Sequence, residues 1–124
     1  MQNVIINSYL DLKAWQEARI LAKLIYQNLS TFPQYEQYGL CDQMRRSVVS
    51  IPSNIAEGFG RSTAKEKNQF FYIAKGSLAE LETQLYVAFD VGYINKSKLE
   101  ELMEQATLTH KILQGLIKAN KERL

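Results

Sequence analysis

A chain of 124 residues with a net charge of +2 has the size of one domain and too little positive charge to indicate nucleic-acid binding by itself. Its content of 46% hydrophobic and 23% charged residues is typical of a globular protein and excludes a disordered one. One cysteine cannot form an internal disulfide, and no stretch approaches the roughly 20 apolar residues of a membrane span. We therefore expect a cytoplasmic protein with no signal peptide and no membrane partner.

The spacing of apolar residues in steps of three and four predicts amphipathic helices throughout the chain. The expected helices cover residues 11–32, 40–59, 64–91 and 96–121. Ser8 or Asp11 is a candidate cap for the first helix, and Pro33 is expected to end it. Short connections between four such helices favour an antiparallel four-helix bundle, so residues 1–124 are predicted to form a single all-α domain.

Proline and capping residues give the expected course of the later helices. Pro52 lies inside the second helix, where a kink or a break is expected because the ring removes one backbone donor. The nearby hydroxyls are expected to bond the carbonyls that the kink frees; they belong to Ser47, Ser50 and Ser53. Thr63 and Glu66 have the spacing of a capping box, Gly92 suits the end of the third helix, and Asn95 suits the start of the fourth.

The third helix has more apolar residues than one buried face requires, since 14 of the 22 residues from Phe70 to Val91 are apolar or tyrosine. Ile73 and Val87 lie two heptads apart on a second flank, which Val91 continues. A second copy of the chain packed on this flank would explain the pattern. The alternative is a wide inner face with a few exposed apolar side chains, which is common.

The residues that usually carry catalysis or bind metals are scarce. His110 is the one histidine, and Thr107 stands where a Glu-x-x-His metal motif would need its glutamate. His110 is the only imidazole that could act as a base for Cys41, and Cys41 is instead expected to be a buried residue at a helix start. No arginine precedes His110 within residues 102–109, as it does in some small helical RNases. We therefore expect no catalytic residues, no metal site and no cofactor.

Positive charge is concentrated in the middle of the chain. Between Gln43 and Lys75 there are six basic and two acidic residues, so this segment is +4 while the remainder is −2. The six basic residues are the candidate nucleic-acid contacts: Arg45, Arg46, Arg61, Lys65, Lys67 and Lys75. Three of them flank the expected start of the third helix, where free amides favour phosphates. The alternative is a solvated charged face, although a ring of subunits would multiply even a modest patch.

Three residues near the end of the second helix are unusual for a solvated exterior helix. Gly58 costs helix stability, which indicates a turn or a close backbone approach. Asn54 and Glu57 lie three residues apart and share a face. We interpret them as residues that join the second helix to the third helix or to a neighbouring subunit.

Several segments resemble a known family. Residues 45–61 read RRSVVSIPSNIAEGFGR, and residues 74–85 read AKGSLAELETQL; both are similar to the four-helix-bundle proteins encoded within 23S rRNA intervening sequences. The match also includes Leu12–Trp15 and the Phe32–Pro33 pair. Lys75 stands where the family commonly has arginine. Pro52 and Glu80 lie in the matching segments and join Ile73, Val87, Asn54, Glu57 and Gly58 as candidate structural or subunit-interface residues.

The resemblance implies a bundle that assembles into a homopentameric barrel. A related branch, the accessory proteins of diversity-generating retroelements, implies binding to nucleic acid and to a reverse transcriptase. Together these observations predict a non-enzymatic, self-assembling bundle that binds RNA or DNA, or a ribonucleoprotein, through its basic surface. The alternatives are a protein-interaction scaffold without nucleic-acid binding and, less favoured, a small RNase-like or toxin–antitoxin bundle.

Overall fold

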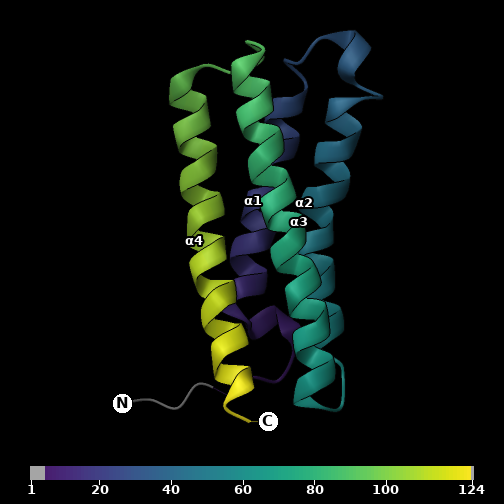
Figure 1. The fold of residues 1–124 in the computed structure, drawn as a ribbon, viewed down its shortest axis with the longest axis vertical. Coiled ribbons are helices and arrows are strands. Elements are labelled where there is room, and N and C mark those ends of the chain that lie inside the picture. Colours follow the sequence, from purple (N-terminus) through teal and green to yellow (C-terminus); the bar gives the residue numbers. More distant parts are fainter. Residues whose placement is uncertain (1–4, 124) are drawn as a thin grey trace.

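The computed structural model describes residues 5–123, and within them the chain forms four long helices and no strand (Figure 1). The helices are α1 (Lys13–Leu29), α2 (Leu40–Phe59), α3 (Ala64–Asp90) and α4 (Lys96–Lys121). Single turns of 3-10 helix, Tyr9–Asp11 and Gln34–Glu36, precede α1 and α2. The helices lie side by side along the long axis of the molecule.

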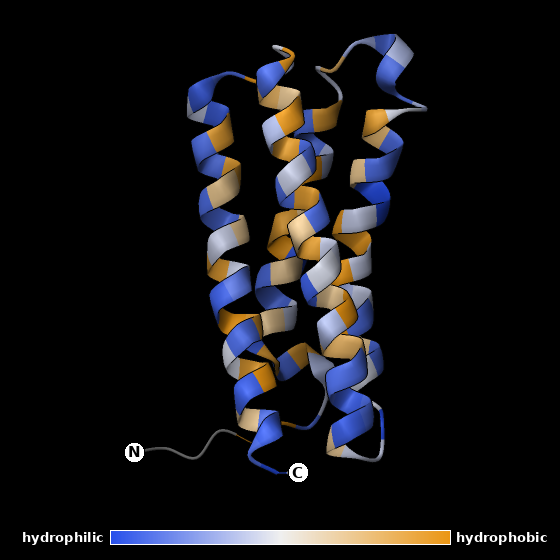
Figure 2. Cartoon of the chain, viewed as in Figure 1, coloured by the Kyte–Doolittle hydropathy of each residue, from blue (hydrophilic) through white to orange (hydrophobic). Residues whose placement is uncertain are grey.

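Each helix packs against two others and buries one apolar stripe between them. α1 and α3 each contact both α2 and α4, and within the described residues the backbones of the two diagonal pairs stay apart. Figure 2 shows hydrophobic and hydrophilic residues alternating along every helix, as amphipathic helices require. The largest fully buried side chains come from every helix: Leu21, Ile25, Met44, Val48, Ile51, Ile55, Leu78, Leu81, Leu85, Leu102, Leu113 and Ile117.

The caps at Gly92 and Asn95 form as predicted, whereas the predicted Thr63–Glu66 capping box forms in one direction only, because the Glu66 carboxylate accepts from the Thr63 hydroxyl at 3.4 Å and not from the Thr63 amide. The Thr63 hydroxyl accepts from the amide of Glu66 at 3.1 Å, and Asn95 Oδ1 accepts from the amide of Lys98 at 2.8 Å. Gly92 has a φ of 86° and follows the last residues of α3. The amide of Tyr93 donates to the carbonyl of Ala88 at 2.8 Å, the bond that closes a Schellman motif. Gly92 is needed there because a positive φ is strained for residues with a Cβ.

The predicted bounds of the first helix, 11–32, are wrong at both ends. Asp11 belongs to the preceding 3-10 turn, where it forms a capping box with Ser8, and Leu12 caps α1 without a side-chain bond. α1 ends at Leu29, before Pro33 can act on it. The carbonyl of Leu29 accepts from the Phe32 amide at 3.1 Å and from the Gln37 side chain at 3.0 Å, so this helix end is satisfied by the following loop.

α2 passes through Pro52 without a break, so that part of the prediction is wrong. The serine hydroxyls near the proline also act differently from the expectation. Ser47 Oγ donates to Gln84 Oε1 at 2.7 Å, and the Ser50 and Ser77 hydroxyls lie 2.8 Å apart. These bonds cross from α2 to α3, so the hydroxyls join two helices instead of compensating for Pro52.

Gly58 lies where α2 and α3 approach closely at their shared end. A Cβ at this position would stand 2.8 Å from a ring carbon of Phe71 and 3.0 Å from the carbonyl oxygen of Lys67. The carbonyl belongs to the backbone and cannot rotate away. The predicted close approach at Gly58 is therefore confirmed.

We expect Gly58→Ala to destabilise the fold by about 1–3 kcal/mol, because the added methyl must displace α3. Gly115→Ala is the matched control, since a Cβ there meets no neighbouring atom among the described residues. That change should stabilise α4 by about 0.5–1 kcal/mol. Urea unfolding at fixed protein concentration measures both. Equal effects of the two alanines would contradict the close approach at Gly58.

A buried carboxylate joins α1 to α4. Glu17 Oε2 accepts from Gln105 Nε2 at 2.7 Å, and Glu17 Oε1 lies 2.8 Å from Lys13 Nζ. The hydrogen bond from Lys13, followed by that from Gln105, lowers the pKa of Glu17, while burial opposes the shift. Gln105 Nε2 also donates to the backbone carbonyl of Glu17 at 3.0 Å. The contact therefore fixes the relative position of these two helices.

We expect Glu17→Gln to cost about 1–3 kcal/mol of stability at neutral pH, because a buried carboxylate loses two charge-assisted bonds. The pKa of Glu17 in the folded chain lies below its ordinary value of 4.5. Its contribution is therefore complete above that pH and is lost as the pH falls through the folded-state value. Urea unfolding at pH 7 and pH 3 measures this difference, with exposed Glu104→Gln as the control. A gap between wild type and Glu17→Gln that stays constant with pH would contradict the assignment.

Candidate nucleic-acid interface

The six predicted nucleic-acid contacts do not form one patch. Arg45 and Arg46 lie near the start of α2, and Arg61 follows its end. At 1.5 Å per residue the two groups are about 20 Å apart along the helix. Lys65 and Lys67 lie in the first turn of α3 beside Arg61, and Lys75 lies further along α3. The structure therefore brings Arg61, Lys65 and Lys67 together and separates them from the other three.

Arg45 and Arg46 are engaged in local contacts. Arg45 Nη2 donates to the carbonyl of Gln37 at 2.6 Å, which holds the loop before α2. Arg46 Nε lies 3.1 Å from Asp42 Oδ2, one turn earlier on the same helix. Arg45 is therefore held by a backbone carbonyl, and the charge of Arg46 is paired with that of Asp42.

The cations at the junction of α2 and α3 are partly engaged. Arg61 pairs with Glu57, and its guanidinium lies over the ring of Phe70 at 4.5 Å. Lys67 Nζ donates to the carbonyl of Phe59 at 2.8 Å and so closes the end of α2. Lys65 is exposed and has no ion pair within residues 5–123. Of these three residues, Lys65 is the one most available to an outside phosphate.

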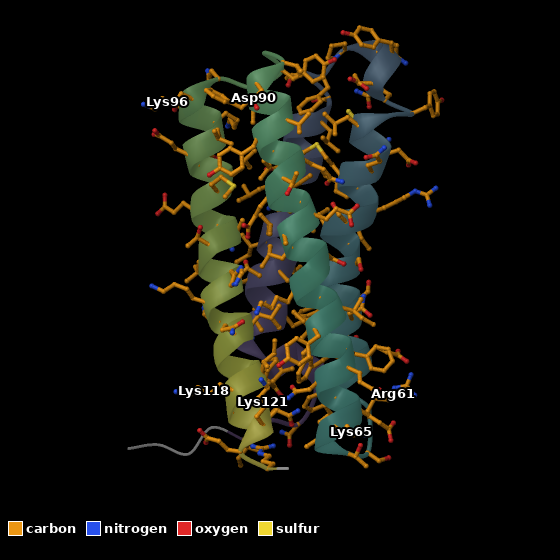
Figure 3. All side chains as sticks on the ribbon, viewed as in Figure 1. Arg61, Lys65, Asp90, Lys96, Lys118 and Lys121 are labelled. Atoms are coloured by element: carbon orange, nitrogen blue, oxygen red, sulfur yellow. The ribbon has the colours of Figure 1, made fainter. Side chains whose placement is uncertain are left out.

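The end of α4 adds cations to the same end of the bundle. Asn120 Nδ2 donates to the carbonyl of Ala64 at 2.8 Å, which holds the last turn of α4 beside the first turn of α3. Figure 3 shows Arg61, Lys65, Lys118 and Lys121 at this end and Asp90 with Lys96 at the other. We call the following residues the basic end: Arg61, Lys65, Lys67, Lys118, Lys121 and Arg123.

The six contacts predicted from the sequence did not include Lys118 and Lys121, which lie at the same end of the bundle as Lys65. The signal was present, since a bundle of alternating helices brings the end of the fourth helix to the start of the third. Lys118 and Lys121 are exposed, and Lys121 Nζ lies 5.4 Å from the centre of the Tyr72 ring. The basic end is therefore built from the start of α3, with Arg61 just before it, and from the end of α4.

The predicted second flank of α3 is exposed in the chain. Ile73 is 50% exposed and Val87 is 44% exposed. Glu80 lies midway between them by helical spacing and accepts from Gln84 Nε2 at 3.3 Å. Because Gln84 bonds Ser47 of α2, this flank borders the α2 side of the bundle. We call Ile73, Glu80 and Val87 the assembly flank.

Asn54 and Glu57 differ in what they join. Asn54 Nδ2 donates to the carbonyl and the hydroxyl of Ser50, at 2.8 and 2.9 Å. Since the Ser50 hydroxyl pairs with Ser77, Asn54 supports the contact between α2 and α3. Glu57 pairs with Arg61. It makes no direct bond to α3 in the described residues, and its predicted contact with a neighbouring subunit stays a prediction.

The candidate catalytic and metal-binding groups lie in different surroundings. Cys41 is buried with its Sγ 3.9 Å from the carbonyl of Leu29, and burial raises the pKa of its thiol. His110 Nδ1 lies 3.6 Å from Glu82 Oε1. No group of three or more potential ligands suits a metal ion in residues 5–123. Over the same residues, no helix combines the length and apolar character that a membrane crossing requires.

Comparison with known proteins identifies the family. The model for the 23S rRNA-intervening sequence proteins matches residues 10–115. The chain belongs to this family. A crystal structure from Bacteroides thetaiotaomicron, described as a protein with unknown function from the S23 ribosomal protein family, matches with a TM-score of 0.76 at 23% identity. The match covers 85% of this chain and 98% of that one and shows a shared fold. No curated protein matches the chain.

The two descriptions name no catalytic activity. The family match ends at residue 115, before the α4 cations Lys118, Lys121 and Arg123. The part of the basic end that α4 contributes therefore lies outside the residues by which the family is recognised.

Proposed function

We propose that this protein is a non-enzymatic, self-assembling helical bundle that binds RNA through its basic end. The single observation that carries the proposal is the contact of Asn120 with Ala64, because it gathers exposed cations from two helices beside one helix start. The first amides of α3 add a partial positive charge there. Phosphates of a nucleic-acid backbone are the anions that such a surface attracts without sequence preference.

The charge of one chain is modest, so the proposal includes assembly. The bundle is proposed to be antiparallel, which is supported by the pairing of Ser47 with Gln84 and of Ser50 with Ser77. The assembly flank would pack against a second copy, and the family resemblance favours a homopentamer. A ring would repeat the basic end once per subunit and so multiply the field that an RNA meets.

A protein partner is the second candidate, favoured by the exposed apolar side chains of the assembly flank. A polypeptide such as a reverse transcriptase would then occupy the flank in place of another subunit. Its binding would depend on Ile73 and Val87 and little on salt. The two candidates therefore differ in how they respond to charge removal.

For assembly, we expect the double variant Ile73→Asp, Val87→Asp to lower the mass of the oligomer, since it places carboxylates in an apolar contact. Leu108→Asp is the control, because Leu108 is similarly exposed but lies on α4. Light scattering on the eluting peak measures the mass. A wild-type monomer, or a double variant with the wild-type mass, would count against this use of the flank.

For RNA binding, we expect affinity to fall as salt rises, with a shallower dependence in the double variant Arg61→Gln, Lys65→Gln. Each lost phosphate contact should reduce the slope of log affinity against log salt by roughly 0.7 for a single strand. The control Lys23→Gln, Arg46→Gln removes the same charge from the distant ends of α1 and α2. Filter binding across a salt series measures both. If the oligomers do not bind RNA at low salt, the protein-interaction module is the better account.

A further inference from the structure

The outer face of α4 carries a groove that leads away from the basic end. It has a volume of about 470 Å³ and is lined by His110, Lys111, Gln114, Gly115, Ile117, Lys118 and Lys121. Its three lysines are exposed. At 1.5 Å per residue, the run from Lys111 to Lys121 extends about 15 Å along the helix. We call this feature the α4 groove.

Charge is unevenly distributed along α4. The first half has exposed Glu100, Glu101 and Glu104, and lysines of the same turns lie beside the first two. From residue 105 to residue 121 the helix has no acidic residue. The lysines of the α4 groove therefore lack acidic partners on their own helix. A polyanion is the complementary occupant of such a groove.

The lining residues of the groove all belong to α4, and two α3 side chains contact residues at its ends. Tyr72 meets Lys121 near one end of the groove, and Glu82 meets His110 near the other. Lys75 lies between Tyr72 and Glu82 on the same flank of α3, since residues three and seven apart share a helix face. Lys75, which is separated from the other predicted contacts, therefore lies on the flank of α3 that borders α4. Glu82 is the acidic group that limits the groove at the His110 end.

Two features of the groove suit a nucleic-acid strand. Gly115 is exposed, and no atom outside its own helix backbone lies within 4 Å of the place where a Cβ would stand. A strand can therefore approach the backbone of α4 closely at this position. The Tyr72 ring is 43% exposed beside the lysines, and aromatic rings next to cations are the elements on which unpaired bases stack.

We infer that the α4 groove is a track for a single strand of RNA that continues from the basic end. Lys75, Lys111, Lys118 and Lys121 contact successive phosphates, and the Tyr72 ring stacks on one base. A duplex offers no free base face, so the groove selects single strands. The inference rests on the proposed RNA binding and names the form of RNA that is bound.

The test compares two probes on the intact protein: an oligouridine of about 16 nucleotides and its duplex with oligoadenosine of the same length. We expect Tyr72→Ala to lower affinity for the single strand roughly 5-fold to 100-fold and to leave duplex binding unchanged. Tyr72→Phe keeps the ring and should retain wild-type affinity. The control is Tyr86→Ala, because Tyr86 is 51% exposed on the same line of α3, two heptads further from the basic end.

A second pair of variants tests the phosphate track. Lys75→Gln with Lys111→Gln should lower the salt slope for the single strand by roughly 0.7 for each contact. The control Lys96→Gln with Lys98→Gln removes the same charge at the start of α4. Circular dichroism and thermal unfolding without RNA check that each variant folds, and light scattering checks its oligomeric mass.

The outcomes separate this inference from the proposed function. If the oligouridine binds and Arg61→Gln with Lys65→Gln weakens it, while both groove variants bind as wild type does, then the track is overturned and RNA binding by the basic end stands. Preference for the duplex overturns the track as well. If neither probe binds at low salt, the proposed function fails and the track fails with it.

Discussion

The close packing of α2 against α3 is the constraint on which the rest of the bundle depends. Gly58 allows the two backbones to meet at one end, because a methyl there would stand 2.8 Å from the Phe71 ring. Further along the pair, Ser47 bonds Gln84, and Ser50 bonds Ser77. An apolar interface tolerates sliding by a helical turn, whereas paired hydroxyls and amides satisfy each other in one register only. This register fixes where the outer face of α3 points and thus where its exposed residues lie.

The same register divides the outward face of α3 into two lines with different neighbours. Ile73, Glu80 and Val87 border α2, because Glu80 contacts the glutamine that bonds Ser47. Tyr72 borders α4, because Lys121 lies over its ring. One helix can therefore serve an apolar contact on one side and a charged groove on the other. Assembly through the first line leaves the second accessible, which is what a subunit that both oligomerises and binds a polyanion requires.

Local sequence patterns predicted the elements of the fold better than they predicted the surface. Apolar spacing and capping residues are local properties, so α2, α3 and α4 and the caps at Thr63, Gly92 and Asn95 follow from them. The first helix was predicted too long because Ser8 and Asp11 cap a 3-10 turn. Pro52 was expected to kink or break α2, but no break occurs, because removing one donor is tolerated where the helix is packed along its length. The candidate site is a tertiary property: Lys65 and Lys118 are 53 residues apart in sequence and lie at the same end of the bundle, where Asn120 bonds Ala64.

Charge that is close in sequence was a poor guide to charge that is close in space. Arg45 and Arg46 were grouped with Arg61 because they fall in one basic segment, yet most of the length of α2 separates them from Arg61, and each is engaged locally. Lys75 lies apart from them, on the flank of α3 that borders α4. In a helical bundle, a surface residue lies at the same height as residues of the adjacent helix. Its spatial neighbours therefore include residues that are far away in the sequence. The proposed polyanion surface runs along the α3–α4 pair, from the helix start at Ala64 toward His110, where Glu82 lies beside the imidazole.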